Sequence, residues 1–153
     1  MSVLSENPGQ RYECGVTNVT LLGHPSRTVA TSVVFQNEDH LHQLIALALV
    51  RRAGPLSGKE IAFLREKYFK LSQSDFAKQF AISLSILRAV EGSAQNDFGI
   101  YRDGVLRKMV YKDLRKTPPV YSVLQGLYNA PRSEDPILIE AEACEQNYWK
   151  LAA

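Results

Sequence analysis

Apolar residues in the first third of the chain follow two different spacings. Two β-type segments come first, one with apolar residues Val16, Val19, Leu21 and Leu22 and one, residues 29–35, that is rich in Val and Thr. Turn-forming residues lie between them at Gly23, His24, Pro25 and Ser26, which predicts a β-hairpin over residues 11–36. From Asn37 the apolar residues recur at helical spacing up to Leu49, which predicts a helix with Asn37 as its N-cap.

The Ala-Gly-Pro sequence at residues 53–55 interrupts this pattern and predicts a domain boundary. Three short segments follow, each with a serine at the N-cap position: Ser57, which has Glu60 at capping-box spacing, Ser72 and Ser83. Their apolar faces consist of Ile61, Phe63, Leu64 and Tyr68 in the first, Phe76, Ala77 and Phe80 in the second, and Ile86, Leu87 and Val90 in the third. Three short helices joined by very short turns, at residues 57–69, 72–80 and 83–91, are typical of a helix-turn-helix unit.

The last third of the chain is predicted to be helical. The pair Asp103-Gly104 fits a hairpin turn, but apolar residues at helical spacing from 105 to 114 also fit a helix starting there, and we favour the helix. Pro118 and Pro119 open another short helix that Pro131 ends, and residues 137–149 are predicted to form a final acidic helix. The predicted fold class is α+β, with a hairpin-plus-helix lobe at 1–53, an all-α domain at 56–130 and an acidic helical extension at 131–153.

Charge is distributed unevenly along the chain. The net charge is only +2, but residues 51–116 hold 14 of the 18 Lys and Arg and 7 of the 16 Asp and Glu, which gives this stretch +7. A basic centre between acidic ends fits a protein that binds nucleic acid. No apolar run approaches the roughly 20 residues needed to cross a bilayer, and residues 1–10 lack the pattern of a secretory signal. We therefore expect a soluble, cytoplasmic protein with no membrane contact.

Residues that bind metals or catalyse reactions form no recognisable pattern. The two cysteines, Cys14 and Cys144, belong to no C-x-x-C pair, so a paired-cysteine zinc site is excluded and reduced thiols are expected. Nothing in the sequence fixes a metal geometry for Cys14, His24, His40 and His42. We expect all four to be surface or packed residues. There is no Gly-rich phosphate loop and no nucleophile elbow. The sequence therefore predicts no enzyme activity, no cofactor and no metal site.

The segment LSQSDFAKQFAISLSILRAVEG, from Leu71 to Gly92, resembles the lambda-repressor-like (Xre) family. The usual family pattern is Leu-Ser-Gln, a Leu-Ala pair, Leu-Gly-Val-Ser and then Ile-Ser-x-Trp-Glu-x-Gly. With the first helix included, the resemblance covers residues 57–92, under a quarter of the chain. The sequence departs from the pattern where Ala81 replaces the turn glycine, Val90 the tryptophan and Ser93 the closing glycine, and where the loop at 68–70 is one residue longer.

This resemblance implies a set of DNA-contacting residues. Ser72 and Gln73 would meet phosphate at the N-terminus of the second helix, and Lys78 would be a further phosphate contact. Ser83 would cap the recognition helix, whose outward residues are Leu84, Ser85 and Arg88, with Ala89 at the margin. Among these, Arg88 is the best candidate to bind guanine, and Leu84 suits a thymine methyl group.

The resemblance also has two structural implications. In the family an arginine of the first helix pairs with the glutamate that ends the recognition helix, which implies a pair between Arg65 and Glu91; a solvated Glu91 is the alternative. If the turn position of Ala81 needs a positive φ, the alanine costs about 1 kcal/mol there. The departures leave open a divergent member that has lost DNA binding, and the capping serines alone also fit a plain three-helix core.

The N-terminal segment is similar to proteobacterial regulators that join a small hairpin lobe to an Xre domain. The similar residues are Tyr12-Glu13-Cys14-Gly15, Asn18-Val19, Leu41-His42 and residues 54–61. This architecture resembles antitoxins of the MqsA type, whose zinc-binding cysteine pairs are absent here. The resemblances imply a sequence-specific transcriptional repressor that binds double-stranded DNA as a homodimer on palindromic sites. The alternative is an antitoxin or adaptor whose main role is to bind a protein partner such as a toxin.

Overall fold

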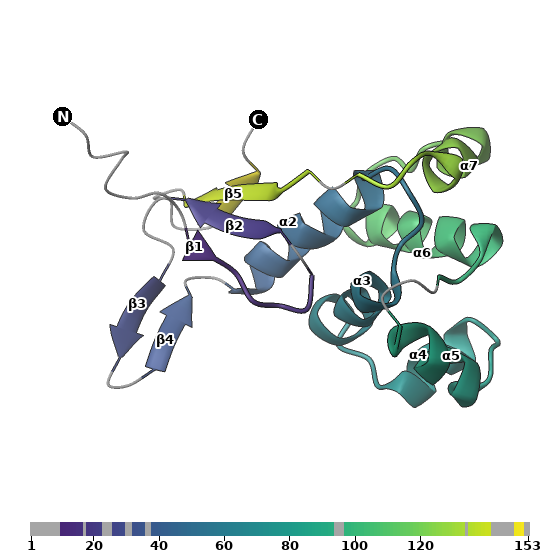
Figure 1. Ribbon diagram of the computed structural model, residues 1–153, viewed down its shortest axis with the longest axis horizontal. Coiled ribbons are helices and arrows are strands. Elements are labelled where there is room, and N and C mark those ends of the chain that lie inside the picture. Colours follow the sequence, from purple (N-terminus) through teal and green to yellow (C-terminus); the bar gives the residue numbers. More distant parts are fainter. Residues whose placement is uncertain are drawn as a thin grey trace. The chain divides into compact units, whose positions relative to one another are not determined.

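The computed structural model of the protein describes residues 10–16, 18–22, 26–29, 32–35, 38–93, 97–133, 135–141 and 149–151. These residues form helices and strands in a mixed α+β fold, so the predicted fold class is confirmed at that level. The chain divides into two compact units: unit 1 lies within residues 1–45 and 134–153, and unit 2 within residues 46–133. Figure 1 labels most helices and strands of both units.

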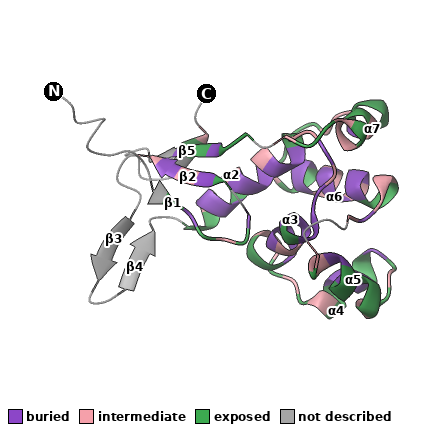
Figure 2. Cartoon of the chain, viewed as in Figure 1, coloured by how far each residue is buried: buried purple, intermediate pink, exposed green. Residues whose placement is uncertain are grey.

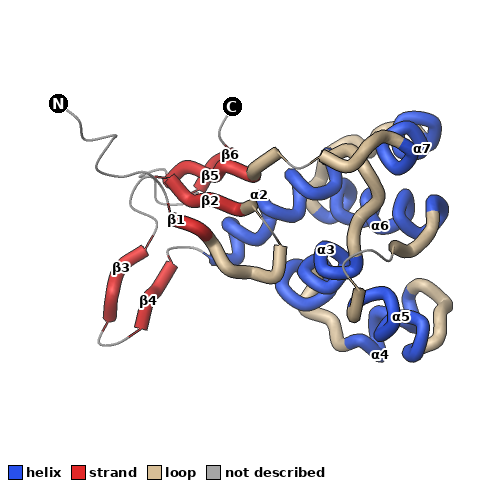
Figure 3. Tube along the Cα trace, viewed as in Figure 1, coloured by secondary structure: helices blue, strands red, loops and turns tan. Residues whose placement is uncertain are grey.

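A four-stranded sheet is the centre of unit 1 (Figure 3). Its strand order is β1 (Gln10–Arg11), β2 (Val19–Leu22), β5 (Ile137–Ala141) and β6 (Trp149–Leu151). β2 and β5 run parallel, with Val19 opposite Ile137 and Leu21 opposite Ile139, whereas the other neighbouring pairs are antiparallel. Because side chains alternate along a strand, these four buried residues share one face of the sheet.

The hairpin of unit 1 differs from the predicted one. It joins β3 (Ser26–Val29) to β4 (Ser32–Phe35), so Ser26 lies in a strand and not in a turn. The predicted pairing of residues 16–22 with 29–35 is wrong, because β2 pairs with β1 and with the distant β5. The other predicted turn residues, 23–25, lie outside the described residues. Turn-forming residues mark where a strand ends, but they do not determine which segment becomes its neighbour.

The acidic helix predicted for residues 137–149 is wrong. The described parts of this segment are strands, and Ile137 and Ile139 are buried while Leu138 between them is 38% exposed. A period of two belongs to a strand, and β-branched side chains such as Ile pack well on a pleated surface. Because β5 pairs with β2, the end of the chain belongs to unit 1 and forms no separate helical extension.

The predicted helix after Asn37 is present as α2 (Glu38–Arg51), although Asn37 itself lies outside the described residues. His42 on this helix is buried, and its Nε2 atom lies 2.8 Å from the hydroxyl oxygen of Tyr12. The same hydroxyl donates to the Glu38 carboxylate at 3.1 Å, so Tyr12 is attached to the first turns of α2. Burial and this carboxylate raise the pKa of Tyr12. The division between the two units falls within α2, at residues 45 and 46.

Helices are the only regular secondary structure among the described residues of unit 2. After the end of α2 it contains α3 (Gly58–Phe63), the π-helical turn η1 (Leu64–Tyr68), α4 (Gln73–Gln79), α5 (Leu84–Glu91), α6 (Ile100–Asp113) and α7 (Tyr121–Asn129). The three short helices predicted between residues 57 and 91 are confirmed, as are the capping box at Ser57 and the helix after Pro119. Residues 100–113 form a helix, so the hairpin alternative is wrong. Among the described residues, no helix is both long and apolar enough to cross a membrane.

The core of unit 2 lies between α3, α4, α5 and α6. Its fully buried side chains include Ile61, Leu64, Phe76, Leu87 and Leu106, and burying each contributes about 1.5–3 kcal/mol. Phe76 also stacks on Phe98, with ring centroids 6.0 Å apart, which attaches α4 to the residues just before α6. Figure 2 shows α3 and α6 largely buried, whereas α5 and α7 carry many exposed residues.

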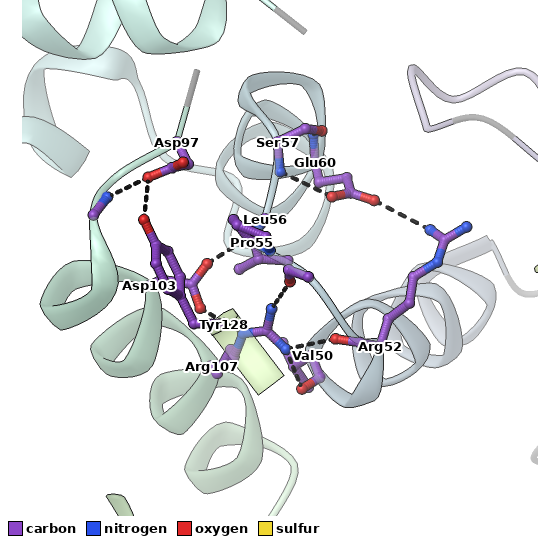
Figure 4. A network of polar contacts seen from close by, with 12 residues as sticks. Val50, Arg52, Pro55, Leu56, Ser57, Glu60, Asp97, Asp103, Arg107 and Tyr128 are labelled. Carbon is purple, nitrogen blue, oxygen red and sulfur yellow. Dashed lines mark hydrogen bonds and ion pairs between the residues drawn. The ribbon is translucent and has the colours of Figure 1, made fainter. Parts of the chain in front are cut away.

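A buried ion pair attaches the segment between α2 and α3 to α6 (Figure 4). Arg107 donates to Asp103 at 2.6 Å, and both side chains have no exposed surface. The same guanidinium donates to the carbonyls of Val50, Arg52 and Gly54 at 3.0, 2.9 and 2.6 Å. Asp103 also accepts the N–H of Leu56 at 2.8 Å. Burial raises the pKa of Asp103, while Arg107 and this N–H act in the opposite direction. The Ala-Gly-Pro break is therefore a fixed connection inside unit 2.

Candidate nucleic-acid interface

Two serines define where α4 and α5 begin. Ser72 caps α4, and its side chain accepts the N–H of Asp75 at 3.1 Å. Ser83 caps α5 in the same way by accepting the N–H of Ile86 at 3.2 Å. Each cap satisfies an N–H group that has no partner within its helix, which contributes about 1 kcal/mol. Both caps are placed as the sequence predicted.

The turn between α4 and α5 depends on one residue in a left-handed conformation. Ala81 has φ +52°, so the condition under which the sequence analysis assigned it a cost is met. The turn is closed by a hydrogen bond from Ile82 N to Ala77 O at 3.1 Å, as in helix ends that usually carry glycine. The Cβ of Ala81 costs about 1 kcal/mol here. That cost is small compared with the packing of the two helices, so the turn keeps its geometry.

The predicted pair between Arg65 and Glu91 is confirmed. Arg65 donates from Nε and one terminal nitrogen to the two carboxylate oxygens of Glu91, at 2.7 and 3.1 Å. The side chains are only 11% and 8% exposed. The other terminal nitrogen of Arg65 donates to the carbonyl of Leu71 at 2.8 Å. One guanidinium therefore holds the end of α5 and the loop that leads into α4.

Arg65 lies in η1, where the backbone has π-helical hydrogen bonds such as Phe69 N to Leu64 O at 2.8 Å. A π-helical turn contains one residue more than an α-helical turn. Arg65 therefore lies in a widened turn between α3 and the loop that leads into α4.

Gln73 connects the pair to the protein surface. Its amide nitrogen donates to Glu91 at 3.0 Å, and its amide oxygen accepts from Arg88 Nε at 3.5 Å. Arg88 itself remains exposed. The first residue of α4 thus contacts Arg88, which is exposed on α5.

A glycine allows α3 to approach the end of α5. A Cβ atom at Gly58 would lie 1.9 Å from the carbonyl oxygen of Val90 and 2.3 Å from that of Ser93. No side chain fits at such distances, so residue 58 must be glycine for the helices to meet there. Sequence reasoning missed this residue because it stands directly after a cap, where many residue types are tolerated.

The outer face of α5 differs from the prediction at one residue. Ser85, Arg88 and Ala89 are exposed and Leu84 is half-buried, while Lys78 is exposed on α4. Ile86 was predicted to be in the core, but it is 51% exposed. Successive residues are about 100° apart around a helix, so Ile86 stands at the margin of the stripe made by Leu87 and Val90. The outer face therefore contains an apolar side chain that the sequence analysis did not assign to it.

The positive charge of unit 2 remains at its surface. Three arginines are partly or fully buried in ion pairs: Arg52 with Glu60, Arg65 with Glu91, and Arg107 with Asp103. Because each pair is neutral, the excess of +7 in residues 51–116 falls on the other charged residues. Ten of these are exposed cations: Arg51, Lys59, Lys67, Lys70, Lys78, Arg88, Arg102, Lys112, Arg115 and Lys116.

Metal ligands do not gather in the part of the chain that the structure describes. No group of three or more His, Cys, Asp or Glu there could hold a metal ion. His42 contacts Tyr12, and Cys14 is half-buried. His24 and Cys144 lie outside the described residues.

Comparison with known proteins adds no relative. No protein-family model, no curated protein and no solved structure matches the chain. The arrangement of α4 and α5 and the charges around them are the features that bear on function.

Proposed function

We propose that unit 2 binds double-stranded DNA through a lambda-repressor-like helix-turn-helix, with α5 as the recognition helix. The protein would act as a sequence-specific transcriptional repressor, as a homodimer, in the cytoplasm. The observation that carries this proposal is the network of Arg65, Glu91 and Gln73, which holds α4 and α5 together and leaves Arg88 exposed. A network that only stabilised a core would have no need to end at an exposed guanidinium.

The dimensions of α5 suit the major groove. The helix has eight residues and is about 12 Å long, and a helix with its side chains is about 10–12 Å wide, close to the width of the groove. In this arrangement Arg88 donates to the O6 and N7 atoms of guanine, and Ser85 contacts a neighbouring base edge. The apolar side chains of Leu84 and Ile86 contact thymine methyl groups.

The N-terminus of α4 supplies contacts to the DNA backbone. Ser72 and Gln73 lie where the N–H groups of this helix are free to meet a phosphate, and Lys78 adds a charge further along. These contacts fix the position of the protein without reading sequence. Because Gln73 also contacts Arg88, the side chain proposed to meet phosphate touches the side chain proposed to meet a base.

The proposed dimer uses the exposed face of α7. Residues 117–131 contain no Asp, Glu, Lys or Arg, although 22% of the chain is charged. Val120, Tyr121 and Val123 are 67%, 44% and 51% exposed. In a two-fold interface each residue lies near its own copy, so an uncharged apolar face suits self-association. Two copies would then read half-sites about 34 Å apart.

Selection of bound duplexes from a random DNA library tests the proposal. We expect the purified protein to enrich a palindromic sequence, and we expect its affinity for random duplex to fall steeply as salt rises. Val123→Lys should convert the dimer to a monomer in sedimentation analysis and weaken binding to the palindrome. Absence of DNA binding at low salt would contradict the proposal.

A protein-interaction module, such as an antitoxin or adaptor, is the second candidate function. The exposed apolar side chains of α7 favour it as well, because such a face suits a different protein as readily as a second copy. A purified chain that binds no DNA and remains monomeric would support this candidate.

A further inference from the structure

A cavity opens between the end of α4 and the beginning of α6, within unit 2. Its volume is about 660 Å³, and it is lined by residues 79–81, residues 98–102 and Val105. Sites that bind small molecules in proteins have volumes of about 300–1,000 Å³. The cavity therefore has the size of a site for a small organic molecule.

Aromatic rings form the inner part of this cavity. Phe80 and Phe98 line it and are only 9% and 6% exposed, with ring centroids 5.4 Å apart. Both rings also pack on the fully buried Phe76, which fixes their positions. Ile100 and Val105 are half-buried and add apolar side chains to the lining. A planar aromatic molecule stacks well on such rings, and rings that are already fixed lose little freedom when it binds.

Positive charge lies at the edge of the cavity. Arg102 belongs to the lining and is exposed, and within the described residues no carboxylate forms an ion pair with it. Gly99, the N-cap of α6, also lines the cavity and offers no side chain to the N–H groups of the first turn. The nearby carboxylates of Asp97 and Asp103 lie outside the lining and accept hydrogen bonds elsewhere. A carboxylate on the ligand would therefore meet a guanidinium at this edge.

The cavity adjoins the turn of the helix-turn-helix. Ala81, the residue of this turn that has a positive φ, is part of the lining. A bound molecule would contact the end of α4, this turn and the first residues of α6 together. Its carboxylate would also neutralise the charge of Arg102 and so reduce the positive potential that attracts DNA.

We propose that this cavity binds a small aromatic carboxylate, with its ring against Phe80 and Phe98 and its carboxylate against Arg102. The bound ligand lowers the affinity of the protein for DNA; this second part rests on the proposed function, whereas ligand binding does not. A molecule with an apolar ring and a single charge matches a lining that is mostly apolar and carries its charge at one edge.

An NMR titration of the full-length protein with trans-cinnamate tests the site, and cinnamamide is the matched uncharged probe. We expect cinnamate to bind about 5-fold more tightly than the amide, which is the upper range for an exposed ion pair. In Arg102→Gln the two probes should bind equally. Lys112→Gln is the control, because it removes an exposed cation from the same helix outside the cavity, and it should keep the preference for cinnamate.

Val105→Trp tests the cavity itself. The larger side chain would occupy the space beside Phe80 and Phe98, so both probes should bind more weakly by about 10-fold or more. Thermal unfolding of the same sample shows whether this variant is folded. The comparison of the two probes in Arg102→Gln does not depend on that result.

The affinity for a random DNA duplex, measured with and without saturating cinnamate, tests the effect on DNA binding. We expect cinnamate to lower this affinity for the wild-type protein and to leave it unchanged for Val105→Trp. Equal binding of cinnamate and cinnamamide by the wild-type protein, or binding of neither, rejects the site. Cinnamate binding without a change in DNA affinity rejects the regulation and leaves the proposed function intact. A protein that binds cinnamate but no DNA at low salt rejects the proposed function and the regulation, and it supports the site alone.

Discussion

Two of the arginines that unit 2 buries against carboxylates, Arg107 and Arg65, differ in what their networks connect. Arg107 is fully buried and pairs with Asp103, one turn earlier on the same helix. Its other N–H groups donate to backbone carbonyls, so every contact stays in the interior. Arg65 is 9% exposed and pairs with Glu91 on another helix, the one that carries the exposed Arg88.

The difference shows that a buried ion pair does not by itself indicate a functional site. In both pairs most polar side-chain atoms have hydrogen-bond partners, and breaking either pair would lower the free energy of unfolding. What distinguishes them is the group at the end of the network. Around Arg107 the network ends in the connection between two helices, and around Arg65 it ends at a side chain that is able to meet a ligand.

Removal of Arg107 should have the largest effect. Arg107→Met leaves the Asp103 carboxylate buried without its partner, and we expect the free energy of unfolding to fall by about 3–5 kcal/mol. Urea denaturation at neutral pH measures this change. Arg107→Met/Asp103→Leu should recover part of the loss, because no unpaired charge remains. A loss below about 1 kcal/mol would show that the pair behaves like one on the surface.

Removal of Arg65 should cost less stability but more binding. Arg65→Met breaks the contacts to Glu91 and Leu71, and we expect a loss of about 2–3 kcal/mol, because hydrogen bonds to charged groups contribute about 1.5–3 kcal/mol. Affinity for the selected DNA site should fall more than in Arg107→Met when both proteins are folded. Glu66→Gln is the control, since Glu66 lies 3.9 Å from Arg65 and is 60% exposed. Equal binding by the two arginine variants would remove the distinction between the networks.

The exposed end of the Arg65 network is tested by Arg88→Ala. A bidentate contact to guanine contributes about 1–3 kcal/mol, so affinity for the selected site should fall roughly 5- to 150-fold, with little change on random DNA. Stability should change by no more than about 0.5 kcal/mol, because Arg88 is exposed. Lys78→Ala should weaken both kinds of site alike. If Arg88→Ala does the same, Arg88 contacts only phosphate.

The smallest expected effect is a gain in stability at the turn between α4 and α5. Ala81→Gly should raise the free energy of unfolding by about 0.5–1 kcal/mol, because glycine adopts a positive φ without strain. The same substitution at Ala89, which is exposed within α5, should lower it by about 1 kcal/mol. Urea denaturation of the two variants compares them directly, and a loss at Ala81 would mean that its methyl group has a packing role.

Features of unit 2 that depend on neighbouring residues were predicted correctly. Ser57, Ser72 and Ser83 cap their helices because a serine side chain reaches an N–H group only three residues away. The pair between Arg65 and Glu91 spans 26 residues, and it was found through the family resemblance and not through spacing.

Features that depend on distant segments were missed. The sequence by itself determined where α3, α4 and α5 begin, since caps, turns and helical spacing act over a few residues. Only the tertiary structure decided that residues 137–141 pair with residues 19–22, that Arg107 binds the carbonyls between α2 and α3, and that Gly58 contacts the end of α5. An isoleucine-rich segment fits a buried strand or a buried helix equally well, and a buried charge shows no sign of its partners in the residues beside it. Which alternative is stable depends on the surface that another part of the chain brings against it.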